Sequence, residues 1–127
     1  MTQQAYNADE AFQQFRQRMH HLQIELGEIK SELGRPDFLG LADRTRDLLR
    51  MTRGLLDGNV NILFANEPAR VPENLYKHIE YAQGHLDKAL GEEYEFDAIV
   101  KRLYMATTLS EYVIRSVQEA LNTMDRQ

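Results

Sequence analysis

Cysteine is absent from the 127 residues of this chain. Its absence excludes disulfides, thiolate catalysis and metal sites with cysteine ligands. Glycine and proline are scarce, at 7 and 3 residues, which leaves room for long uninterrupted helices and argues against disorder. No apolar run approaches the roughly 20 residues that a transmembrane helix requires, so we expect no membrane span.

Charge and length narrow the class of protein further. The formal net charge of −5 disfavours generic binding to nucleic acid. Residues 1–9 are polar and lack the apolar core of a signal peptide, so a cytoplasmic location is expected. A chain of this length is typical of one domain that folds without a metal or a disulfide. We therefore expect a single helical domain over residues 1–127, with residues 1–7 as a loose N-terminal tail.

The most regular pattern is an apolar stripe in the first quarter of the chain. Its members recur at alternating steps of three and four residues, which is the spacing of one face of an α-helix. Such a helix is not stable alone in water, because its apolar face needs cover from other helices. The members are Phe12, Phe15, Met19, Leu22, Leu26, Ile29 and Leu33.

Similar stripes predict three further helices, and the steps of three and four suit coiled-coil-like packing. The Asp57-Gly58-Asn59 turn is expected to end the second helix and to open a longer loop over residues 60–71. The chain is thus predicted to be all-α, an antiparallel four-helix bundle with up-down-up-down topology. The four helices are expected near 8–33, 37–57, 73–90 and 95–124. The core is expected to include Leu22, Leu26, Leu48, Ile79, Leu86, Leu103, Val113 and Val117.

An apolar segment in the predicted loop is the first candidate for binding a partner protein. Long ordered loops are enriched in function, which favours a binding site there. The alternative is that the segment tucks its large side chains under the end of the bundle. The segment comprises Val60, Ile62, Leu63 and Phe64.

Three arginines on one face of the second helix are the second candidate. Arg46, Arg50 and Arg53 could bind phosphate or an acidic protein partner, because guanidinium groups match such anions well. The alternative is pairing within the helix, since Asp43 and Asp47 are within helical reach of Arg46 and Arg50.

His85 and Lys88 indicate a different possible function. A histidine followed three residues later by a lysine on a bundle helix resembles the histidine phosphotransfer domains. That resemblance implies that His85 would accept a phosphoryl group from an aspartyl phosphate, with Lys88 balancing the phosphate charge. The alternative is that His78 and His85 are partly buried residues at the edge of the apolar stripe.

Metal sites have little support in the sequence. Glu25, Glu28 and Glu32 resemble the glutamate-rich helices of all-α nucleotide pyrophosphohydrolases, which hold magnesium between carboxylates. The alternative is a solvated acidic face. The paired Glu-x-x-His motifs of di-iron bundles are absent. We expect neither a metal nor a cofactor.

No constellation in the sequence supplies a nucleophile, a base and an oxyanion donor together. We therefore predict a non-catalytic protein-interaction module, such as an adaptor, a small chaperone or an assembly factor. It is expected to self-associate as a homodimer through the first or fourth helix, because regular stripes readily pair between chains. The alternative function is a phosphorelay protein that uses His85.

Overall fold

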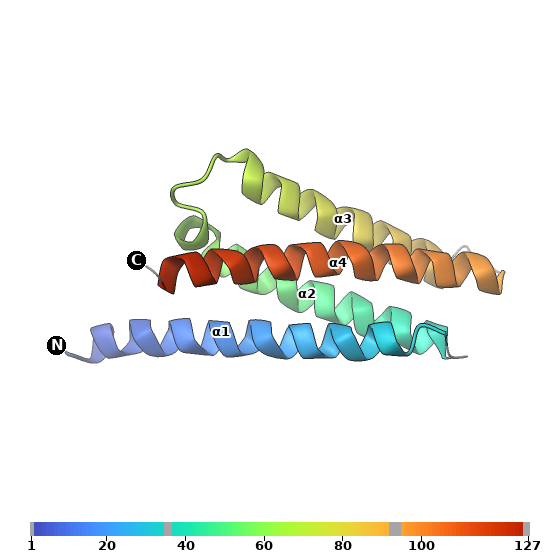
Figure 1. Ribbon diagram of the computed structural model, residues 1–127, viewed down its shortest axis with the longest axis horizontal. Helices are drawn as coiled ribbons and strands as arrows, with labels where there is room; N and C mark the ends of the chain where they lie inside the picture. Colours follow the sequence, from blue (N-terminus) through green and yellow to red (C-terminus); the bar gives the residue numbers. More distant parts are fainter. Residues whose placement is uncertain (1, 35–36, 92–94, 126–127) are drawn as a thin grey trace.

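The computed structural model describes residues 2–34, 37–91 and 95–125, and every regular element among them is a helix. The helices are α1 (Thr2–Ser31), α2 (Phe38–Leu63), α3 (Arg70–Gly91) and α4 (Phe96–Asp125). Figure 1 shows that successive helices run in opposite directions, so the topology is up-down-up-down. The predicted all-α class and four-helix bundle are confirmed.

Two predicted helix ends are wrong. The first helix begins at Thr2, so residues 2–7 belong to α1 and not to a loose tail. The second continues through the expected turn at 57–59 to Leu63, which leaves 64–69 as its connection to α3. This connection is no longer than the one over residues 32–37 that joins α1 to α2.

Tertiary packing explains why α2 passes through a glycine and an asparagine. Buried Leu56 and Leu63 lie on either side of the expected turn, and both belong to the core. Their burial outweighs the cost of about 1 kcal/mol that a glycine imposes on a helix. The Asn59 side-chain amide also donates to the Leu55 carbonyl at 2.8 Å, a bond that the continuing helix permits.

The apolar stripes of the four helices meet in one core, and all eight predicted core residues are buried. Polar residues at three stripe positions are also buried, namely Thr45, Thr52 and Ser110. Each hydroxyl donates at 2.7 Å to the carbonyl four residues earlier in its own helix. The core therefore accepts these hydroxyls without leaving them unsatisfied.

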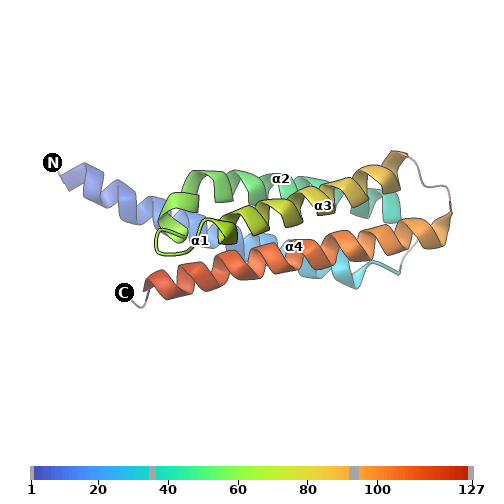
Figure 2. The ribbon, with the colours of Figure 1, turned by 90° about the horizontal axis from the view of Figure 1, so that it is seen from above.

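The bundle has a rhombic cross-section. In the part of the chain that the structure describes, α2 lies close to α4 across the core, whereas no Cα atom of α1 lies within 8 Å of a Cα atom of α3. Helix α1 therefore packs mainly against α2 and α4. Figures 1 and 2 both show its N-terminal end reaching beyond the ends of the other three helices.

Polar contacts fasten α1 to α4 along the edge of the core. Lys30 pairs with Glu111, and Gln118 donates to the Gln23 side chain at 2.7 Å. The hydrogen bond from Lys30 is the largest cause that lowers the pKa of Glu111 below its ordinary 4.5. Because the pKa of Glu111 is lowered in the folded protein, the Lys30–Glu111 pair stabilises the fold at pH values above the ordinary pKa of 4.5. This stabilisation is lost as the pH falls below 4.5 and through the lowered pKa of Glu111.

Leu103 and Tyr104 give a matched test of this packing, because they are neighbours with 0% and 53% exposed side chains. We expect Leu103→Ala to lower the free energy of unfolding by about 2–5 kcal/mol, since it leaves a cavity in the core. Tyr104→Ala should change it by less than about 0.5 kcal/mol. Urea titration measures both, and equal losses would contradict the assigned core.

Candidate protein-interaction surfaces

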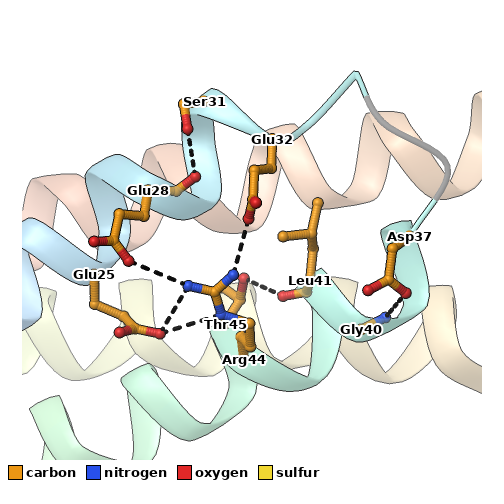
Figure 3. A network of polar contacts seen from close by, with 9 residues as sticks. All are labelled: Glu25, Glu28, Ser31, Glu32, Asp37, Gly40, Leu41, Arg44 and Thr45. Atoms are coloured by element: carbon orange, nitrogen blue, oxygen red, sulfur yellow. Dashed lines mark hydrogen bonds and ion pairs between the residues drawn. The ribbon is translucent and has the colours of Figure 1, made fainter.

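One arginine of α2 gathers three carboxylates of α1, as Figure 3 shows. Arg44 lies 3.2 Å from Glu25, 3.5 Å from Glu28 and 2.9 Å from Glu32. The spacing of the glutamates by three and four residues places them on one face of α1. Burial opposes the charge of Arg44, but the hydrogen bonds and charges of Glu25 and Glu32 outweigh it and raise the pKa of the guanidinium.

This cluster therefore joins α1 to α2. The carboxylates that resemble a magnesium-binding helix are turned toward a guanidinium, which occupies the place that a cation would need. Among residues 2–34, 37–91 and 95–125, no group of three or more histidine or acidic side chains is arranged to hold a metal ion.

The predicted arginine face of α2 lies mainly against α3. Arg46 pairs with Asp87 of α3 at 3.2 Å, and the Arg53 guanidinium lies 5.6 Å from the centre of the Tyr76 ring. Arg50 pairs with Asp47 of its own helix at 3.7 Å and is mostly exposed. These contacts join the helices, and binding of an acidic partner by the three arginines stays a prediction.

Tyr76 strengthens the same seam between α2 and α3. Its hydroxyl donates to the Asp57 carboxylate. Burial, followed by this hydrogen bond, raises the pKa of Tyr76 to about 12. The hydroxyl therefore stays protonated at neutral pH and keeps its role as a donor.

The predicted apolar segment lies at the end of α2 and just after it. Leu63 and Phe64 are buried, which agrees with the alternative that the large side chains of this segment tuck under the end of the bundle. Val60 is half-buried. Ile62 is 58% exposed. The segment borders a cleft of about 400 Å³, whose other side is formed by the last turns of α4. Only Ile62 offers a large apolar side chain to a partner here.

His85 lies half-buried on α3, with its Nδ1 atom 2.9 Å from Nη1 of Arg102 on α4. Burial, then the charges of Arg102 and exposed Lys88, lower the pKa of His85, so the ring is neutral at neutral pH. Because a guanidinium only donates, Nδ1 is the acceptor and the ring proton is on Nε2. The ring lone pair that would attack an aspartyl phosphate is thus directed at Arg102.

The structure also reveals a surface that the sequence patterns did not single out. We call it the tyrosine surface, and it comprises Tyr81 of α3 with Tyr104, Met105 and Tyr112 of α4. These side chains are 62%, 53%, 44% and 46% exposed, in that order. One feature of the sequence could have identified this surface. Its four residues lie outside the apolar stripes, at positions where packing in the core does not require a large apolar side chain.

Contacts across the seam between α3 and α4 join the face of α3 that carries Tyr81 to α4. The His78 ring stacks on Tyr112 with their centres 4.4 Å apart. His85 bonds to Arg102 on α4 as described above. Tyr81 follows His78 by three residues and precedes His85 by four, so it shares their face of α3. Tyr104 and Met105 also border a shallow apolar hollow of about 300 Å³.

Comparisons with protein-family models, with curated proteins and with solved structures found no match to this chain. Within the described residues, no helix has both the length and the apolar character needed to cross a membrane. The case for a function therefore depends on the surfaces described above.

Removing the cation of the Arg44 cluster should destabilise the bundle. We expect Arg44→Met to lower the free energy of unfolding by about 1 kcal/mol, because three partly exposed carboxylates lose their shared partner and repel one another. Arg50→Met is the matched control, since Arg50 has only an exposed pair within its own helix. If chemical denaturation shows no difference between these variants, the cluster does not join α1 to α2 energetically.

Proposed function

We propose that this chain is a non-catalytic protein-interaction module that binds a partner protein through the tyrosine surface. The observations that carry the proposal are the four large, half-exposed apolar side chains on α3 and α4 and the apolar hollow that Tyr104 and Met105 border. Contiguous exposed apolar patches mark interaction sites on soluble proteins. Tyrosine and methionine are enriched in protein interfaces, and tyrosine is among the residues that contribute most to binding energy.

The chemistry of the surface suits a protein partner. A tyrosine brings a large apolar ring and a polar hydroxyl, and it has few rotatable bonds to immobilise on binding. The stack of His78 on Tyr112 restricts that ring further before any partner arrives. The helices beneath are held by a packed core, so the surface is presented in one arrangement. An adaptor, a small chaperone or an assembly factor would use such a platform.

The polar residues that might have supported catalysis serve the fold instead. Arg44 is engaged by three carboxylates, and Arg46 by Asp87. His85 accepts from Arg102. Phosphotransfer from His85 stays the alternative prediction. A neutral ring beside two cations suits a phosphate, but the orientation of its lone pair does not favour attack.

Substitution of the two most exposed tyrosines tests the proposal. We expect Tyr81→Ala and Tyr104→Ala each to weaken binding to the native partner by about tenfold or more, which is typical of an interface tyrosine. Both variants should stay folded, because these side chains are mostly outside the core. The partner is first isolated with the wild-type chain from the native host, and affinity is then measured by titration with the purified partner.

Ile24→Ala is the control, because Ile24 is a similarly exposed apolar residue, at 49%, on α1. It should bind as the wild type does. Full binding by both tyrosine variants would contradict the proposal. Loss of binding in Ile62→Asp alone would move the site to the cleft at the end of α2. Turnover of a small molecule by the wild type would overturn the non-catalytic assignment.

A further inference from the structure

A groove between α1 and α2 is a concave feature that the proposed function does not use. It measures about 480 Å³, and its apolar lining includes Leu22, Met51 and Leu55. Arg18, His21 and Glu25 of α1 border it, and Gly54 of α2 opens it. Met51 is 55% exposed. Ile62, seven residues after Leu55 on the same face of α2, continues this exposed apolar strip.

The N-terminal end of α1 is the part of the chain that could fill such a groove. The ribbon of this end extends past the other three helices in both views (Figures 1 and 2). Positions 3, 7 and 10 continue the helix face that carries Arg18 and His21 farther along α1. One continuous face of α1 therefore begins at the protruding end and borders the groove in its middle.

Charge along this face is complementary in an antiparallel sense. Glu10 is exposed near the free end, and Arg18 is exposed at the groove. Neither side chain has an ion pair with any other residue that the structure describes. They cannot pair with each other within one chain, because eight residues of helix separate their backbones by about 12 Å.

We infer that a second copy of this chain places the N-terminal end of its α1 in the groove, in an antiparallel two-fold pairing centred on Gln14. Glu10 and Arg18 are each four residues from Gln14, so Glu10 of each copy meets Arg18 of the other. Residue 7 meets His21 in the same way. The inference rests on the self-association included in the predicted function, but not on the tyrosine surface.

The groove leaves room for a neighbouring helix. A side chain placed at Gly54 would meet no atom within 4 Å, so a neighbouring helix can approach the backbone of α2 closely. The small residue of the incoming segment that lies nearest to the pairing face is Ala11. Met51 has a flexible side chain that adapts to such a surface. The dimer would cover both Met51 and Ile62, the two exposed apolar side chains of the strip.

An exchange of charges tests the pairing. In sedimentation velocity over a concentration series, we expect the wild type to form dimers. Glu10→Arg and Arg18→Glu should each raise the dimer dissociation constant by about tenfold or more, because each reversal creates two like-charge contacts. The double variant should restore the wild-type constant, since it exchanges the members of both pairs. Restoration cannot arise within one chain, where the two residues are too far apart.

A steric block tests the groove independently. Gly54→Phe should give a folded monomer, because the new side chain fills open space above α2. Gly84→Phe is the matched control, since Gly84 is also open but lies on α3. This control should dimerise as the wild type does, and circular dichroism verifies that both variants are helical.

The possible outcomes test the groove pairing separately from the proposed function. A wild-type dimer that survives Gly54→Phe, or single reversals that the double variant does not rescue, would overturn the groove pairing. Such a dimer would leave the tyrosine surface untouched as a partner site. A wild-type chain that stays monomeric throughout would remove the inference and the predicted self-association. Binding of the partner protein by Gly54→Phe would still support the proposed function.

Discussion

The contact between α2 and α4 across the core is the constraint on which the rest of the structure depends. These two helices meet along the short diagonal of the bundle, and α1 and α3 each pack against both of them. Leu48 and Leu103 are fully buried at 0% exposure on this diagonal pair of helices. Among the described residues, no Cα atoms of α1 and α3 lie within 8 Å of each other, and each of these helices forms one seam with α2 and one with α4. Both proposed binding surfaces lie on such seams.

The spacing of apolar residues was enough to predict the fold class and the core, because a stripe at steps of three and four has one physical solution. It was not enough to place the end of α2. Gly58 and Asn59 favour a turn by themselves, and only the burial of Leu56 and Leu63 in the finished bundle overrides them. The Arg44 cluster could not be predicted from the sequence either, because its contacts depend on how α1 and α2 are aligned along their lengths.

The tyrosine surface shows a second limit on what the sequence alone can predict. Tyr104 and Tyr112 are plain in the sequence, but their exposure depends on which side of α4 the neighbouring helices leave open. The predicted arginine face shows the opposite case, and binding of a partner there stays a prediction. Arg46 and Arg53 lie outside the apolar stripe, yet Asp87 and Tyr76 of α3 engage them. Sequence periodicity separates core from surface, and it does not separate a free surface from a seam.

The two proposals combine into one arrangement. A dimer joined along α1 and the α1/α2 groove would leave the α3/α4 side of each copy open, so it would present two tyrosine surfaces. Two linked sites bind a multivalent partner more strongly than either site alone. The central claim is that the α3/α4 side, and not the α2 side, receives the partner protein. A photo-crosslinking residue placed in the native host at exposed Thr108, beside Tyr104 and Met105, tests it most directly against one at exposed Asp43 of α2. The account predicts a specific crosslinked partner from position 108 and none from position 43, and the reverse result would contradict it.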